Sequence, residues 1–346
     1  MTTSRDQAAR TTAPAPERRS FSHRVVFSGL VLSLVFALAV AGYIYFRYVR
    51  YERVAAQHVP AGSVAALRVD LEKVVLYEPF RAHFLPLLEE QQTKAPDPGT
   101  RLERIKRYTG VELGVDTREI VLSTGPGPAD WALLVGGMFR AGAVVPGIER
   151  MMQDEQRPFA RSADGMVLVA PGGIALAQAS DGVVVIASSE ARARAALPPG
   201  GVHQQLGLSE EGPGGFAITG SGLRSFVPSA LLALVPGLST LNDVARVRGD
   251  LALAQDVTLQ TTVELTRGTG EEAARQVESL LGGVQAAARL PLAGGVFGGA
   301  ADFASRVRVT PGPGASATLE GVWSRAEVDR AAAQVAAFLR QAFGWR

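Results

Sequence analysis

A run of 22 residues, from position 25 to position 46, contains no charged side chain and interrupts an otherwise mixed pattern of apolar and polar positions. As a helix this run would extend about 33 Å, enough to cross a hydrocarbon core of about 30 Å. Arg24 precedes the run and Arg47 follows it. The pattern predicts one transmembrane helix over residues 25–46, which acts as an uncleaved signal-anchor. A cleaved signal peptide is the alternative, because residues 39–41 (Ala-Val-Ala) have the small-residue pattern of a cleavage site.

Aromatic and basic residues gather at the ends of this predicted helix, where the headgroups of a bilayer would lie. Four of the six tyrosines fall at its C-terminal end. Five arginines precede the helix and three follow it, so the positive-inside rule favours a cytoplasmic N-terminus and a periplasmic main domain at the inner membrane. The residues expected at the membrane interface are Arg24, Tyr43, Tyr45, Arg47, Tyr48 and Tyr51.

Small residues recur at every fourth position of the predicted transmembrane helix. This spacing forms a narrow ridge on which a second helix can approach closely, so it suggests a homodimer. The alternative is chance, because small residues are frequent in this segment. The ridge consists of Gly29, Ser33, Ala37 and Ala41.

Beyond the anchor, strand-like and helix-like patterns alternate. Residues 257–265 alternate apolar and polar side chains, which predicts a strand with one buried face. Helical patterns cover residues 72–92, 270–289 and 325–343, and capping boxes at Thr269–Glu272 and Ser324–Glu327 open the last two. Hairpins and helices predominate over strand–helix–strand crossovers. The predicted fold class is therefore α+β, with a largely antiparallel sheet.

The order of elements divides the chain into parts. Residues 1–24 form a basic tail with too few large apolar side chains to fold alone, so we expect this tail to be disordered. Residues 54–197 and 216–346 each read as strand, helix, hairpin, helix, hairpin, helix. The Gly- and Pro-rich segment 198–215 is the predicted linker. This order suggests two similar halves that arose by duplication.

Composition and charge narrow the function. The chain carries a net charge of +2, with an isoelectric point near 9.1. The basic excess lies beside the predicted anchor, and residues 54–346 are slightly acidic, so nucleic acid is not an expected partner. The absence of cysteine excludes disulfides and thiol chemistry. The preference for Arg over Lys and the frequent Ala and Gly are typical of a GC-rich bacterial genome.

No motif for catalysis or cofactor binding is found. The chain lacks HExxH, GxSxG, a Walker A loop and an EF-hand loop. His58 and His203 have no partner at metal-ligand spacing and are expected to be solvated. The sequence therefore predicts no cofactor, no metal site and no catalytic residue. An active site assembled from distant residues is the alternative.

Two apolar segments are unusual for a packed core. Residues 226–241 are interrupted by Pro228 and Pro236, and residues 290–301 are rich in glycine. A Pro-kinked core helix and a packed loop are one interpretation. The other is an apolar binding surface for a ligand, a partner or the bilayer. Its residues would be Phe226, Leu231, Leu232, Leu234, Val296 and Phe297.

These features favour a membrane-anchored, non-enzymatic binding or scaffolding protein that engages an envelope partner or an apolar ligand. An anchored hydrolase with a dispersed active site is the alternative. The expected partners are the lipid bilayer, a second copy of the chain and an envelope protein whose identity the sequence leaves open.

Overall fold

The computed structural model of the chain describes residues 51–83, 86, 101–127, 129–227, 238–288 and 304–342. The predicted tail, the transmembrane helix and its small-residue ridge lie outside these residues. Of the predicted apolar surface, only Phe226 is described. Of the residues predicted at the membrane interface, only Tyr51 is described. Within the described parts of the chain, no helix is both long enough and apolar enough to span a membrane.

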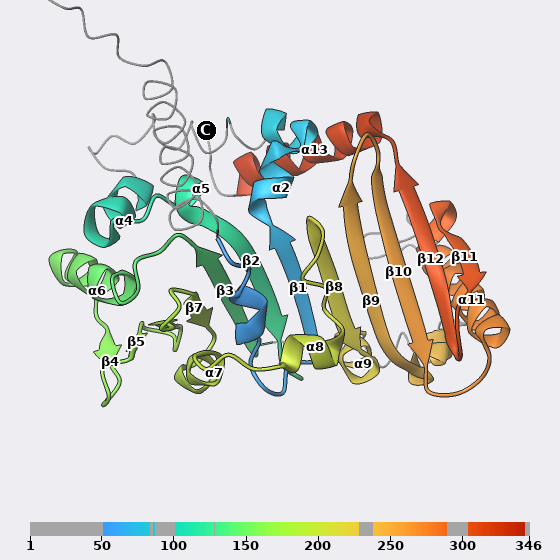
Figure 1. Cartoon of the computed structure of the whole chain (residues 1–346), viewed down its shortest axis with the longest axis horizontal. Coiled ribbons are helices and arrows are strands. Elements are labelled where there is room, and N and C mark those ends of the chain that lie inside the picture. Colours follow the sequence, from blue (N-terminus) through green and yellow to red (C-terminus); the bar gives the residue numbers. More distant parts are fainter. Residues whose placement is uncertain are drawn as a thin grey trace, which may run out of the picture. The chain divides into compact units, whose positions relative to one another are not determined.

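Twelve strands form one sheet in which every pair of neighbours is antiparallel, so the α+β prediction with a large antiparallel sheet is confirmed (Figure 1). Their order across the sheet is β11-β12-β10-β9-β8-β1-β2-β3-β7-β6-β5-β4. The strands are β1 (Ala65–Asp70), β2 (Thr117–Thr124), β3 (Trp131–Gly137), β4 (Ala160–Arg161), β5 (Val167–Val169), β6 (Ala175–Gln178), β7 (Val184–Ala187), β8 (Gly214–Thr219), β9 (Val244–Leu253), β10 (Val257–Leu265), β11 (Arg308–Pro311) and β12 (Ser316–Trp323).

Helices cover both faces of the sheet. They are η2 (Ala55–His58), α2 (Leu71–Leu76), α4 (Arg101–Thr109), α5 (Leu113–Asp116), α6 (Val144–Asp154), α7 (Glu190–Ala196), α8 (Val202–Leu206), α9 (Gly220–Phe226), η3 (Leu238–Asn242), α11 (Gly270–Ala288) and α13 (Arg325–Ala342). Both predicted capping boxes are present: the backbone N–H of Thr269 donates to Glu272 at 2.9 Å, and that of Ser324 donates to Glu327 at 2.9 Å.

The first face of the sheet carries the main core. Ala66, Val121 and Leu134 point to this face and pack with buried residues of η2, α7 and α8. Successive side chains of a strand point to opposite faces, so Leu67 and Leu133 belong to the second face. We call these the covered face and the open face.

Among the described residues, helices pack on the open face toward its two sides. On one side, Val144 of α6 packs with Val184 of β7. On the other side, Val277 of α11 packs with Val263 and Leu319 of β10 and β12. Between these two clusters lie the central strands β8, β1, β2 and β3.

Both predicted halves contribute to the same sheet. Strands β1 and β8 pair directly, with Ala66 opposite Ala217. On one side the order is β1-β2-β3-β7-β6, and on the other it is β8-β9-β10-β12-β11. The segment between the halves contains α8, and Leu206 and Leu208 of this segment are buried in the main core.

One predicted helix is interrupted. The sequence pattern predicts a single helix over residues 72–92, whereas α2 ends at Leu76 and Tyr77 is extended. Pro79 explains the break, because proline lacks a backbone N–H and its ring would clash with the carbonyl of Val75 four residues earlier.

Candidate functional site

Charged residues are buried where the chain enters the folded unit. The Nε of Arg68 on β1 lies 2.6 Å from the carboxylate of Glu119 on β2. Arg68 is 0% exposed and Glu119 is 1% exposed. The other oxygen of Glu119 accepts from the hydroxyl of Tyr51 at 3.3 Å and from the backbone N–H of Ala55 at 3.1 Å. A second pair joins Arg53 to Asp70 at 2.6 Å. We call Tyr51, Arg53, Arg68, Asp70 and Glu119 the junction cluster.

The junction cluster is structural in character. Burial and the nearby charge of Glu119 raise the pKa of Tyr51, so its phenol keeps its proton and donates. Arg68 also donates to the carbonyls of Glu211 and Gly212, at 3.3 and 3.4 Å. A buried charge with several partners in place is held rather than free to react. The cluster therefore ties the first residues of the folded unit to two central strands.

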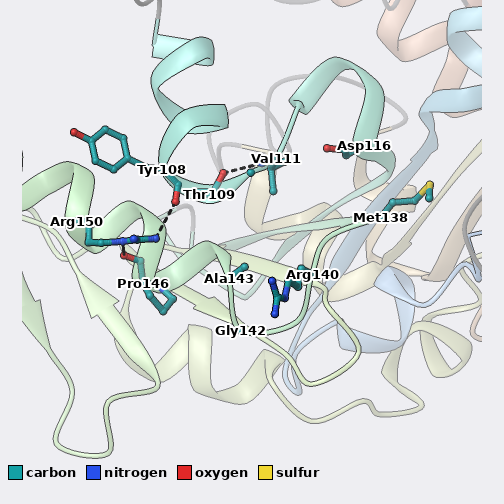
Figure 2. A pocket seen from close by; sticks show the side chains of 11 residues that line it. Tyr108, Thr109, Val111, Asp116, Met138, Arg140, Gly142, Ala143, Pro146 and Arg150 are labelled. Carbon is teal, nitrogen blue, oxygen red and sulfur yellow. Dashed lines mark hydrogen bonds between the residues drawn. The ribbon is translucent and has the colours of Figure 1, made fainter.

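A half-open pocket of about 550 Å³ lies between α4 and α6, beside the end of β3 (Figure 2). Apolar Val111 and Pro146 line it together with Arg140 and Arg150. Arg150 is engaged by the protein, because its Nη2 donates to the carbonyl of Tyr108 at 3.2 Å. Figure 2 shows Arg140 near Gly142 and Ala143.

The chemistry of this pocket is limited. Its only carboxylate, that of Asp116, accepts the backbone N–H of Glu112 at 2.7 Å. Histidine, serine and lysine do not line it, so its described residues offer no base paired with a nucleophile. Its lining mixes apolar and polar side chains, including two arginines, and is suited to a small amphipathic molecule.

A row of apolar side chains crosses the centre of the open face. Leu67 of β1 stands directly opposite Phe216 of β8 and Leu122 of β2, and Leu122 stands opposite Leu133 of β3. Leu67 is 46% exposed and Leu122 is 39% exposed, whereas Phe216 and Leu133 are half-buried. We call these four residues the central row.

The central row exists because strand β1 inverts the usual alternation and strand β2 also buries a charged residue. In an ordinary half-buried strand the apolar residues point inward and the charged residues outward. Here Arg68 and Glu119 point into the covered face, which leaves Leu67 and Leu122 on the open face. Leu67 is thus exposed because its neighbour in the chain, Arg68, is a buried charge, and Leu122 stands opposite Leu67 on the same face.

Gly249 leaves space for the ring of Phe216, the aromatic residue of the central row. Gly249 of β9 stands opposite Phe216, and a Cβ atom at Gly249 would lie 2.3 Å from the ring. The ring therefore lies over the bare backbone of β9, where any other residue would displace it.

The structure corrects the expectation for two histidines. His58 and His203 are buried, not solvated. The Nδ1 of His58 lies 2.7 Å from the carbonyl oxygen of Ala196, and its Nε2 lies 2.8 Å from the carboxylate of Asp181. The Nε2 of His203 lies 2.6 Å from Glu210. In a catalytic triad the second nitrogen of such a histidine faces a nucleophile, but in His58 a carbonyl occupies that place.

Sequence patterns alone miss the contacts of His58 because its partners are remote. Asp181 is 123 positions from His58. Among the described residues, no group of three or more acidic or histidine side chains could hold a metal ion. Phe226, the one described residue of the predicted apolar surface, is exposed at the end of α9.

Comparison with known proteins identifies no family. No family model and no curated protein matches the chain. Solved structures of TP0453 in crystal forms I and III are similar to 83% and 82% of this chain and to 98% of the TP0453 chain. Their sequence identities are 9% and 8%, and their TM-scores are 0.41 and 0.40. At this level of likeness the comparison assigns no activity, substrate or partner.

Proposed function

We propose that this chain is a membrane-anchored, non-enzymatic binding or scaffolding protein of the bacterial envelope. Its predicted anchor holds the folded unit at the periplasmic face of the inner membrane, and the central row engages an apolar ligand or an envelope partner. The observation that carries this proposal is the inverted alternation of β1, matched by a buried charge on β2. It buries the Arg68–Glu119 pair and leaves Leu67 and Leu122 at the surface.

The energetics of the inversion favour a binding role. Burying a charged pair costs desolvation that its mutual attraction only partly offsets. Exposing leucines forfeits about 25 cal/mol for each Å² of apolar surface left in water. A protein that used these strands only for stability would gain from the opposite arrangement. Contiguous exposed apolar surface of this kind is typical of interaction sites.

Site-specific photo-crosslinking tests the proposed function. The chain contains no cysteine, so single Leu67→Cys and Leu122→Cys variants can each carry one benzophenone label in the native membrane. We expect light-dependent adducts at both positions, because the occupant of the row must touch these side chains. A mass increase equal to a small molecule indicates an apolar ligand, and a large gel shift indicates an envelope protein.

The matched control is Val322→Cys. Val322 is 49% exposed on β12, but it stands opposite Thr258 on the covered-face side of the sheet. It should yield no adduct. Adducts of equal yield at all three positions, or at none, would contradict binding at the central row.

The hydrolase alternative has no supporting geometry among the described residues, and it can be tested separately. A fluorophosphonate probe reacts with activated serine nucleophiles. We expect no labelling of the native full-length chain, and labelling that is lost after heat denaturation would overturn the non-enzymatic assignment.

The anchor remains part of the proposal. We infer that Gly29 and Ser33 pack against a second copy of the chain, because their spacing supports close approach of two helices. Gly29→Ile with Ser33→Ile should lower self-association in a membrane two-hybrid assay. Unchanged association would exclude this interface.

A C-terminal alkaline phosphatase fusion should be active, since the main domain is expected in the periplasm.

We further infer that the two halves arose by duplication. The matching strand orders on either side of the β1–β8 pair support this, as do α6 and α11, which pack on the same face. Superposing the two five-strand sets in an experimental structure should align α6 with α11. A mismatch in their direction along the sheet would contradict the duplication.

A further inference from the structure

Apolar side chains face solvent on short helices at one end of the sheet. Helices α2 and α5 bury none of their residues. Leu76 of α2 is 71% exposed and Val115 of α5 is 55% exposed. Isolated exposed leucines are common, but contiguous exposed apolar surface marks a contact. We call the following five residues the end patch: Val75, Leu76, Leu113, Val115 and Met138.

The parts of the end patch are attached to neighbouring strand ends. Helix α2 follows Asp70, the last residue of β1, which pairs with Glu119 near the start of β2. Helix α5 ends at Asp116, immediately before β2. The backbone N–H of Met138, just beyond β3, donates to the carbonyl of Asp116 at 2.9 Å. Figure 1 shows α2 and α5 at the same end of the sheet.

The polypeptide enters the folded unit at this end. Tyr51 bonds to Glu119, and Arg53 pairs with Asp70, so both residues stand at the ends of β1 and β2 that carry the patch. The predicted anchor ends at Phe46, five residues before Tyr51. Five extended residues reach at most about 17 Å. An anchor that ends at Phe46 would therefore leave only a five-residue connection between the bilayer and Tyr51.

We propose that the end patch docks on the lipid bilayer and seats its apolar side chains in the bilayer interface. This inference rests on the anchor of the proposed function and adds a second, folded contact with the membrane. The short tether keeps the patch near the lipid, and its exposed leucines, valines and methionine gain by leaving water. The anchor and the patch together would fix the orientation of the central row relative to the membrane.

The contact is apolar in character. Acidic and basic residues are mixed on these segments: Glu72 adjoins Lys73 on α2, and Glu112 before α5 pairs with Lys106. Such a mixture gives no strong attraction to anionic lipid. Docking should therefore occur equally on zwitterionic and anionic membranes.

Lipid quenching of a fluorophore tests the docking. The full-length chain is reconstituted in phosphatidylcholine vesicles that carry doxyl-labelled phosphatidylcholine, with and without phosphatidylglycerol. Single Leu76→Cys and Val115→Cys variants carry an NBD label. We expect a loss of NBD emission at both positions, of equal size in both lipid mixtures. The control is Ile174→Cys, which is 45% exposed at the start of β6, at the opposite end of the sheet.

The outcomes separate the docking from the anchor. Quenching at Leu76 and Val115 but not at Ile174 supports the docking. Equal emission at all three positions, in a chain that resists carbonate extraction, overturns the docking and leaves the anchor intact. Release of the chain by carbonate overturns the anchor and, with it, this inference. Quenching that requires phosphatidylglycerol overturns the apolar character of the contact.

Discussion

Replacing Arg68 with methionine is expected to lower the free energy of unfolding by about 3–5 kcal/mol, because it leaves the carboxylate of Glu119 buried without its cation. The pair lies at 2.6 Å, and neither side chain reaches solvent. Tyr51 and the backbone N–H of Ala55 still donate to Glu119, but neither neutralises its charge. The urea midpoint of the full-length chain in nanodiscs, followed by tryptophan fluorescence, measures the loss.

Two further variants isolate the cause. Arg68→Met combined with Glu119→Leu should recover much of the loss, because removing both charges removes the unpaired one. Arg161→Met removes the cation of a surface pair with Glu149 and should leave the midpoint almost unchanged. An unchanged midpoint for Arg68→Met alone would show that the pair contributes nothing to stability.

Leu134→Ala is expected to cost about 2–5 kcal/mol, whereas Leu67→Ala should cost about 1 kcal/mol or less. Leu134 is fully buried in the main core on β3, and its truncation leaves a cavity. Leu67 is of the same residue type on a central strand, but nearly half of its surface already contacts water. The same urea experiment compares the two variants.

This comparison also bears on the proposed function. If Leu67→Ala destabilises the isolated chain as much as Leu134→Ala does, the central row is part of the core and is not available to a ligand. If the cost is small but crosslinking at Leu67 is lost when the opposing Phe216 is replaced with Asp, the row acts as a binding surface.

Much of the regular structure follows from local patterns. The alternation over residues 257–265 predicts β10, and its apolar side chains are largely on the buried face. The capping boxes at Thr269 and Ser324 predict where α11 and α13 begin, since the caps satisfy backbone groups within a few residues of the chain. These features depend on neighbours in sequence, so the sequence suffices for them.

Other elements escape local patterns. Helices η2, α5 and α8 have only four or five residues, too few to display a helical period. The buried positions of His58 and His203 depend on carboxylates from elsewhere in the chain, Asp181 and Glu210. Of the predicted apolar surface only Phe226 falls within the described residues. No local sequence pattern predicts the central row.

By itself the sequence determined the fold class, the positions of β10, α11 and α13, and the presence of an uncharged run long enough for an anchor. The tertiary structure alone decided which face of β1 and β2 is open. Alternation in a single strand predicts leucine on the buried face and charge on the exposed face, which is the reverse of what β1 shows. The pairing of β1 with β2 decides which face is buried. Arg68 and Glu119 meet only because these strands are neighbours, and their opposite charges allow both side chains to be buried. Leu67 and Leu122 are then left on the exposed face.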